Sequence, residues 1–357
     1  MANVSGTRKG YAVGEKKRIL YYDVLNVAAC FSVIVLHFNG VAHIYSPTAM
    51  WYQALSAECL FFWAVPVFLM LTGATLMRYR DRYDTRTFFK KRLTRVLVPF
   101  LIWSVVALTW KIATGQLSPH FGPRTIIDLI FNTQTLEAYW FFIPLIAIYL
   151  AMPVLSLLAK DENDRALWYG VGVAFVTMSL LPPLFRLVGM TYNTSLNFPL
   201  FGGYLIFPVL GYLLAKTQLS KRQRLAIYAA GIVAVAIRYI AIILLSAEQG
   251  VITEQFWSYL EFPGVLPAMA VFVFAKQVRW DRLFRTPTAQ HALSRVARCS
   301  LGIYLIHMFV FWHGLQIPGF SWTELAWRTV GPVVAYALCL AVVFLVKKVP
   351  GLRVVFP

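Results

Sequence analysis

Charged residues are scarce in this sequence. Only 13% of its 357 residues are Asp, Glu, Lys or Arg, whereas 59% are hydrophobic. Soluble globular domains usually carry about 25% charged residues. A chain with so few charges cannot cover a water-facing surface, and most of its surface is expected to lie in lipid. The composition therefore predicts one integral membrane protein rather than a series of soluble domains.

Acidic residues are the scarcer of the two signs. The sequence has 15 Asp and Glu against 33 Lys and Arg, a formal net charge of +18. In a soluble protein this excess would suggest a nucleic-acid partner. Here the basic residues form short clusters between apolar runs, which is typical of membrane topology and of contact with anionic lipid headgroups. We expect membrane lipid and no nucleic acid among the partners. The sequence gives no indication of oligomeric state.

Cysteines and the motifs of soluble enzymes are also rare. The four cysteines have no CxxC spacing, so we expect small buried residues rather than a disulfide or metal framework. The chain has no HExxH motif and no paired His/Asp spacing, so no metal site is predicted. It also has no GxSxG elbow, Walker A motif or GxGxxG fingerprint. The first apolar run is longer than a typical signal-peptide core, and no leader is expected.

Long apolar runs dominate the sequence. A bilayer span needs about 20 apolar residues, because the hydrocarbon core is about 30 Å thick and an α-helix rises about 1.5 Å per residue. We predict an all-α membrane bundle of about ten transmembrane helices with both termini cytoplasmic. Residues 1–18 and 349–357 would be cytoplasmic tails, and residues 19–348 the transmembrane domain. The predicted spans are 19–39, 54–77, 96–113, 138–158, 166–188, 198–215, 225–246, 257–275, 299–317 and 325–346.

The distribution of basic residues tests this topology independently. If residues 1–18 are inside, 28 of the 33 Lys and Arg residues fall in inside segments. Four fall outside and one, Arg238, lies within a span. Cytoplasmic loops carry an excess of Lys and Arg. The alternation therefore supports an even number of spans.

Polar side chains in the first predicted span form a stripe. Asp23 and Asn26 are one helical turn apart, and His37 follows Asn26 by about three turns on the same face. Ionisable groups in a membrane span are functional candidates, because they are costly in lipid unless paired or hydrated. The alternative is that Asp23 caps the helix and His37 lies at the outer interface.

A basic cluster, which includes Lys91, Arg92 and Arg95, precedes the third predicted span. Topology alone explains most of this charge. However, we expect Arg92 and Arg95 to lie one turn apart at a helix start, where positive charge is unfavourable with the helix dipole unless an anion is nearby. A phosphate-bearing cytosolic ligand or a lipid headgroup would fit.

The later spans carry further polar groups. Ser300, Tyr304 and His307 share one face of the ninth predicted span, with His307 near mid-membrane. We expect His37 to lie nearer the outer surface. Arg238 and Glu261 fall in the outer half of the membrane and could pair with each other or contribute to catalysis. In the second span, Pro66 predicts a kink, and Gly73 with Ala74 predicts close helix packing.

These residues resemble the membrane-bound acyltransferase-3 family. The resemblance runs in order over nearly the whole chain and is carried by five motifs. These are DVLN at 23–26 followed by His37, VPVF at 65–68 with Thr72 and Gly73, KRLTRVLVP at 91–99, YWFFIPLIAIYL at 139–150 and SLGIYLIH at 300–307.

The resemblance implies transfer of an acyl group, expected to be acetyl, from cytosolic acyl-CoA to a hydroxyl of a carbohydrate or lipid-linked acceptor. The family's key catalytic histidine maps to His37, and its donor-side basic pair maps to Arg92 and Arg95. Many members have arginine where this chain has Asn26, which removes a charge from that position. The expected location is the bacterial plasma (inner) membrane.

Acyl transfer to a hydroxyl needs a base, and a histidine can take that proton. Direct attack of the hydroxyl and an acyl-histidine intermediate both fit the sequence. Two other functions fit a bundle with a polar stripe: a transporter or flippase for a lipid-linked glycan, and a non-catalytic membrane subunit. Transporters often show repeated halves with broken helices, and no such repeat is evident here.

Overall fold

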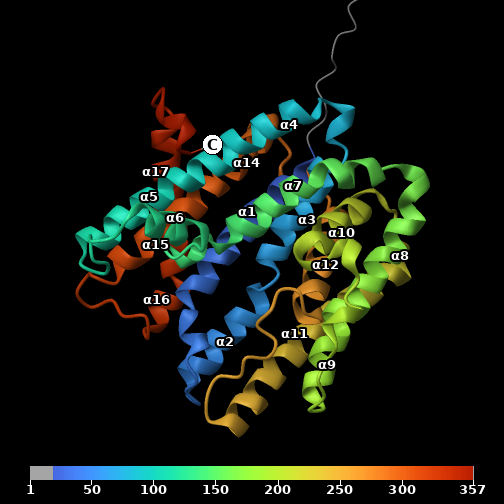
Figure 1. Ribbon diagram of the computed structural model, residues 1–357, viewed down its shortest axis with the longest axis horizontal. Helices are drawn as coiled ribbons and strands as arrows, with labels where there is room; N and C mark the ends of the chain where they lie inside the picture. Colours follow the sequence, from blue (N-terminus) through green and yellow to red (C-terminus); the bar gives the residue numbers. More distant parts are fainter. Residues whose placement is uncertain (1–18, 357) are drawn as a thin grey trace, which may run out of the picture.

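A computed structural model describes residues 19–356, so the predicted N-terminal tail lies outside the described residues. The described chain is a bundle of helices without a strand (Figure 1). The α-helices are α1 Leu20–Phe38, α2 Ala49–Phe61, α3 Ala64–Leu76, α4 Thr85–Arg92, α5 Val98–Ala113, α6 Pro123–Phe131, α7 Phe142–Leu158, α8 Asp164–Ala174, α9 Leu181–Leu187, α10 Ile206–Lys216, α11 Lys221–Gln249, α12 Phe262–Gln277, α13 Trp280–Leu283, α14 Pro287–Ala297, α15 Ser300–Gly314, α16 Leu325–Thr329 and α17 Gly331–Val346.

Six helical runs within residues 19–356 are long and apolar enough to cross a membrane, and the bent pair of α14 and α15 would make a seventh. The six are Leu20–Phe38, Ala49–Asp81, Thr85–Ala113, Glu137–Leu158, Asp161–Leu187 and Lys221–Gln249. Three shorter apolar helices, Gly203–Lys216, Phe262–Gln277 and Gly331–Val346, cover the remaining predicted spans. With 10–17 residues each, they reach at most about 25 Å. The helical nature of the bundle is confirmed, whereas the count of ten spans and the side of each terminus stay predictions.

Helix α1 runs through the middle of the bundle. It packs against α2, α3, α12, α14, α15 and α17. At its C-terminal end, the ring of Phe38 stacks on Trp327 and meets Phe311 edge to face. The amide of Asn39 also donates to the carbonyl of Arg328 over 3.2 Å. These contacts fix the end of α1 and therefore the position of the neighbouring His37.

Helices α3 and α10 touch backbone to backbone. A Cβ atom on Gly73 would lie 1.8 Å from the carbonyl oxygen of Pro208, and one on Gly211 would lie 2.0 Å from that of Met70. Small residues allow such close approach between helices in a membrane. The predicted packing role of Gly73 is therefore confirmed: it faces the backbone of Pro208 in α10, and Gly211 of α10 faces the backbone of Met70 in α3.

Pro66 explains the break between α2 and α3. A proline cannot donate to the carbonyl four residues earlier, and its ring clashes there. The regular helix accordingly ends at Phe61 and restarts at Ala64. Glu58 and Phe62 are one turn apart beside this break, and both line the same cavity.

The expected helix start at Arg92 is wrong. The helix begins at Thr85, where the side chain of Asp84 accepts from the backbone amide of Thr87 over 2.9 Å. Hydrogen bonding with Thr87 holds the pKa of Asp84 below its usual range. A π-helical turn, Leu93–Leu97, joins α4 to α5. Arg92 and Arg95 therefore lie inside a continuous helical run, Thr85–Ala113, and the helix-dipole argument does not apply to them.

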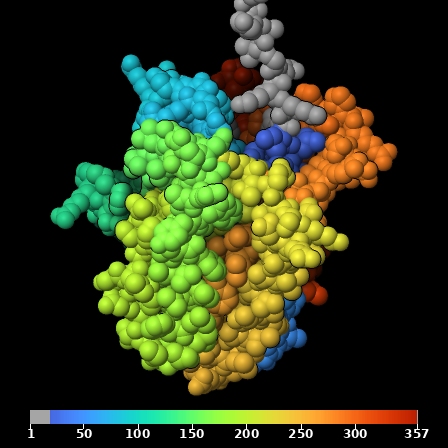
Figure 2. Space-filling model, turned by 90° about the vertical axis from the view of Figure 1, so that its right-hand side faces the viewer, coloured from blue at the N-terminus to red at the C-terminus, as the bar shows by residue number. Residues whose placement is uncertain are grey.

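In Figure 2, α12 is visible between α8–α9 and α11, and the segment around α14 protrudes from the body. The predicted C-terminal tail packs back onto the helices: Phe356 is buried, and the indole of Trp103 donates to the carbonyl of Val355 over 3.1 Å.

Candidate active site

Two cavities lie along α1, one toward each end. The basic cavity, of about 760 Å³, surrounds the first turns of α1 and is lined by residues that include Asn26, Arg78, Arg82, Arg92, Arg298 and Tyr304. The aromatic cavity, of about 510 Å³, surrounds the last turns of α1 and is lined by residues that include His37, Glu58, Phe62, Trp140, Trp257 and Tyr259. Tyr304 lines both cavities and so stands between them.

The basic cavity carries both charge and unsatisfied polar atoms. Four arginines and two aspartates, Asp23 and Asp81, line it. Within the described chain, Asn26 Oδ1, Arg92 Nε and Ser300 Oγ are buried without a hydrogen-bond partner. Buried polar groups are almost always paired, so a cluster of unpaired ones needs an explanation. A polar, anionic ligand in this cavity would satisfy them.

The three predicted basic residues do not share one environment. Arg92 lines the basic cavity, with its guanidinium carbon 5.8 Å from the ring centroid of Tyr149. Arg95 is exposed and lies outside this lining. Lys91 is exposed too, with its ammonium 4.0 Å from the ring centroid of Tyr83. Residues three apart share a face of an α-helix, but the π turn that begins at Leu93 rotates Arg95 away.

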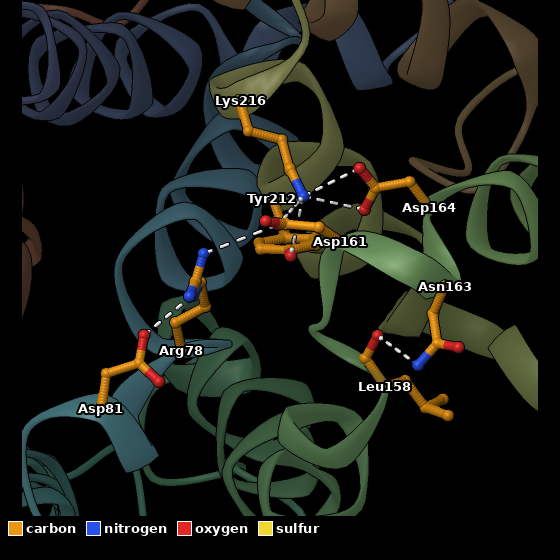
Figure 3. A network of polar contacts seen from close by, with 8 residues as sticks. All are labelled: Arg78, Asp81, Leu158, Asp161, Asn163, Asp164, Tyr212 and Lys216. Carbon is orange, nitrogen blue, oxygen red and sulfur yellow. Dashed lines mark hydrogen bonds and ion pairs between the residues drawn. The ribbon is translucent and has the colours of Figure 1, made fainter.

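A polar network holds one rim of the basic cavity (Figure 3). Arg78 donates to Asp81 over 2.8 Å and lies 3.7 Å from Asp161. Lys216, at the end of α10, pairs with Asp161 at 2.6 Å and Asp164 at 2.8 Å. Most of these side chains are exposed, so each pair contributes little stability. The network connects the loop after α3 to the loop before α8 and to α10, and it orients Arg78 at the cavity mouth.

Asp23 and Asn26 lie together in the basic cavity, as their spacing predicts. The carboxylate of Asp23 accepts from the hydroxyl of Ser294 in α14 over 2.9 Å. Asp23 therefore connects α1 to the helix that precedes α15. His37, on the same face of α1, opens on the aromatic cavity instead. The predicted polar stripe thus passes from one cavity to the other.

His37 and His307 meet at the aromatic cavity. Their ring centroids are 5.0 Å apart, so the expectation that the two histidines differ in depth is wrong. His307 is fully buried, and its Nδ1 lies 2.6 Å from the carbonyl oxygen of Tyr304. A carbonyl only accepts, so Nδ1 carries the proton and Nε2 holds the lone pair. That Nε2 has no hydrogen-bond partner within the described residues.

Tyr304 is held rigidly between the cavities. Its hydroxyl donates to the carbonyl of Ala138, and its ring centroid is 5.4 Å from that of His307. In the opposite direction, the hydroxyl of Tyr139 donates to the carbonyl of Leu305 over 2.7 Å. These reciprocal hydrogen bonds join α15 to the segment before α7. The side chain that separates the cavities therefore has a fixed position next to the histidine pair.

Arg238 and Glu261 do not pair with each other. Arg238 is fully buried and lies 3.4 Å from a carboxylate oxygen of Glu58, whereas Glu261 pairs with Arg186. Arg238 also donates to the carbonyls of Phe256 and Glu58. The expected pair fails because sequence position gives the approximate depth of a residue but not which helix it faces.

Several residues that line the cavities were not predicted as site residues from the sequence. Arg298 and Tyr149 line the basic cavity, and Glu58 and Trp257 line the aromatic one. Glu58 carried a usable signal, because it is an acidic residue inside the second predicted span. Nothing in the sequence distinguishes Arg298 from the other basic residues of its segment.

The four cysteines are all buried and unpaired, as predicted for small buried side chains. Among residues 19–356, no three His, Cys, Asp or Glu side chains are grouped as metal ligands.

The fold and the site define a helical membrane protein with a histidine pair between a basic and an aromatic cavity. The family model described as an acyltransferase domain, acyltransferase-3, matches residues 19–346. The chain therefore belongs to the acyltransferase-3 family, and its family supports a membrane acyltransferase. No curated protein and no solved structure matches the chain.

Proposed function

We propose that this protein transfers an acyl group, most simply acetyl, from cytosolic acyl-CoA to a hydroxyl of an extracytoplasmic or lipid-linked carbohydrate. The bacterial plasma membrane is the proposed location. The observation that carries the proposal is the arrangement of two unlike cavities that meet at Tyr304 beside His37. A cavity lined by arginines suits a phosphate-bearing donor. A cavity lined by rings and hydrogen-bonding groups suits a sugar.

The basic cavity is the proposed donor site. The coenzyme A phosphates would contact Arg92 and its neighbours Arg78, Arg82 and Arg298. The thin pantetheine arm would extend along α1 toward Tyr304, past Asn26 and Ser300, whose unsatisfied oxygens can accept hydrogen bonds from its amide groups. In this chain Asn26 has no charge, so its proposed role is hydrogen bonding rather than ion pairing.

His37 is the proposed base. It would accept the proton of the acceptor hydroxyl while that oxygen attacks the thioester carbonyl carbon. Collapse of the tetrahedral intermediate breaks the carbon–sulfur bond, and the coenzyme A thiolate leaves and takes up a proton. In the alternative route, His37 first attacks the carbonyl and carries the acyl group to the hydroxyl. His307 would position His37 through the contact between the two rings, whose centroids lie 5.0 Å apart.

Thioester consumption tests the proposal directly. Purified protein in lipid nanodiscs would be supplied with acetyl-CoA and a glycan acceptor extract, and free thiol would be measured over time. We expect thiol release that depends on the acceptor and is accompanied by acetylated glycan in the mass spectrum. Glycan movement across the membrane without thioester consumption would instead support a flippase. Glycan analysis of cell envelopes with and without the gene would identify the acceptor.

A further inference from the structure

The two cavities differ in the charge of their linings. Four arginines line the basic cavity, whereas Lys and Arg are absent from the described lining of the aromatic cavity. Its ionisable lining residues are Glu58, Glu137, His37 and His43, in addition to Tyr259 and Tyr304. A ligand that is itself an anion would therefore meet carboxylates in this cavity and no permanent cation.

Glu58 is the buried carboxylate of this lining. It is 3% exposed, and its two oxygens lie 3.4 Å from Arg238 Nη2 and 4.0 Å from His43 Nε2. An ionised carboxylate offers about four acceptor sites. The contact to Arg238 is long, and 4.0 Å is beyond hydrogen-bond distance, so most of this acceptor capacity remains for a ligand.

Arg238 is the buried basic partner of Glu58. It is fully buried, and its guanidinium carbon is 3.5 Å from the ring centroid of Phe62. It lies behind Glu58 and is not part of the cavity lining. The guanidinium contacts Glu58 but is not exposed to a ligand in the cavity. The Glu58–Arg238 pair therefore presents hydrogen-bond acceptors to the cavity and no donors.

Flat rings form the rest of the wall. Trp140 and Tyr259 stack with an interplanar angle of 13°, and Tyr259 in turn stacks on Phe62 at 14°. Trp257 lies beside His43, with 4.3 Å between ring centroids. Because Phe62, Tyr259 and Trp140 stack on one another, Tyr259 in the middle turns its edge to the cavity. A pyranose ring can contact this apolar wall while its hydroxyls reach a carboxylate.

We propose that Glu58 determines acceptor specificity: it accepts hydrogen bonds from the hydroxyls of a neutral sugar and disfavours an acidic sugar. The inference rests on the proposed function, because it assigns the aromatic cavity to the acceptor. A neutral sugar supplies the donors that Glu58 lacks. A uronic acid replaces one of these hydroxyls by a second carboxylate, which Glu58 repels at short range.

The test compares two probes that differ only at C6: phenyl β-D-glucopyranoside and phenyl β-D-glucopyranosiduronic acid. Binding to protein in nanodiscs would be followed by tryptophan fluorescence, since Trp140 and Trp257 line the cavity. We expect the wild type to bind the glucoside at least about tenfold more tightly than the uronide. Equal binding of both probes, or binding of neither, overturns the inference.

Glu58→Gln is the informative variant. Glutamine keeps the shape and leaves a carbonyl oxygen as hydrogen-bond acceptor for Arg238, but it removes the counter-charge of this buried guanidinium, so Tm is measured for the variant as well. We expect glucoside affinity to fall several-fold and the preference over the uronide to shrink to about two- to threefold. An unchanged preference in a variant with wild-type Tm contradicts the inference. If the variant does not fold, equal binding of the two probes by the wild type still overturns the inference.

Glu254→Gln is the matched control. Glu254 is exposed and lies three residues before Trp257, and it is not part of either cavity lining. This variant removes the same charge as Glu58→Gln, but from the loop that carries Trp257, so its preference should equal that of the wild type. Thioester consumption is measured separately: its absence refutes the proposed function, whereas transfer without discrimination refutes only the role of Glu58.

Discussion

The imidazole rings of His37 in α1 and His307 in α15 lie 5.0 Å apart, centroid to centroid. Only His37 lines a cavity, while His307 is fully buried behind it. The two histidines therefore have unequal access to a substrate. This inequality assigns different roles to them and leads to two predictions that can be separated by kinetics.

His37→Ala should abolish acyl transfer while expression and Tm stay near wild type. General-base catalysis contributes about 10²–10⁴-fold, and more is lost if the histidine also carries the acyl group. Because His37 is only partly buried at a cavity, its loss should perturb packing little. The measurement is thiol release and product formation in membranes with matched protein levels. Full activity in this variant would refute the mechanism.

His307→Asn should reduce kcat about tenfold to a hundredfold and leave the KM for both substrates nearly unchanged. An asparagine amide can replace Nδ1 as donor to the carbonyl of Tyr304 but offers no equivalent of Nε2. A positioning residue acts on the reacting state more than on substrate binding. The control His307→Ala should lose Tm as well, because it leaves a buried cavity. A variant of His307 with no activity at all would make it the base instead.

Arg92→Gln should weaken acyl-CoA binding by about ten- to a hundredfold, equivalent to roughly 1.5–3 kcal/mol for one charge-assisted phosphate contact. Arg95→Gln is the matched control, since it removes the same charge three residues away from an exposed position outside the cavity. Calorimetric titration with a non-hydrolysable acyl-CoA analogue measures the affinity of each variant for the donor. Equal effects of the two variants would contradict the separation that the π turn creates.

Gly73→Ala and Gly211→Ala should each destabilise the bundle by roughly 1–3 kcal/mol, as overpacked positions do. A new Cβ would overlap the backbone of the facing helix at 1.8 Å or 2.0 Å, so α3 and α10 must separate. Gly172→Ala in α8 is the control, because its Cβ would meet nothing within 4 Å. It should leave Tm unchanged or slightly raised, since alanine is the better helix former. Thermal unfolding in one detergent provides the comparison.

Helical periodicity was enough to predict which side chains of α1 share a face. Asp23, Asn26 and His37 all line cavities, because their spacing alone places them on one side of a helix. Periodicity does not say which helix that face meets. The contact between His37 and His307 and the pairs of Arg238 and Glu261 with distant partners depend on tertiary packing, which no local spacing encodes.

The basic cluster shows a second limit of sequence reasoning. The motif spacing predicts that Arg92 and Arg95 act together, and this holds only in a regular α-helix. The π turn at Leu93–Leu97 changes the angle between these two side chains, and nothing in the apolar sequence that follows signals it. Pro66, in contrast, gave a correct local prediction, because a proline disrupts a helix through its own covalent structure.

The membrane topology leads to the last prediction. Reporter fusions should place residues 78–95, 216–224 and 276–298 in the cytoplasm and residues 40–53 and 247–256 outside. The reason is that the first three segments contain clusters of Lys and Arg, whereas the last two contain neither.

This topology decides which cavity the donor can enter. The basic cavity is lined by three arginines of the 78–95 segment, Arg78, Arg82 and Arg92, and by Arg298 at the end of the 276–298 segment. Its mouth therefore lies on the same side of the membrane as these two segments. Acyl-CoA is cytosolic, and its phosphates cannot cross the hydrocarbon core unaided. A cytoplasmic 78–95 segment therefore allows donor binding at Arg92 and leaves the aromatic cavity for an acceptor from the opposite side. An extracytoplasmic 78–95 segment would put the arginines out of reach of the donor, and the assignment of both cavities would then fail.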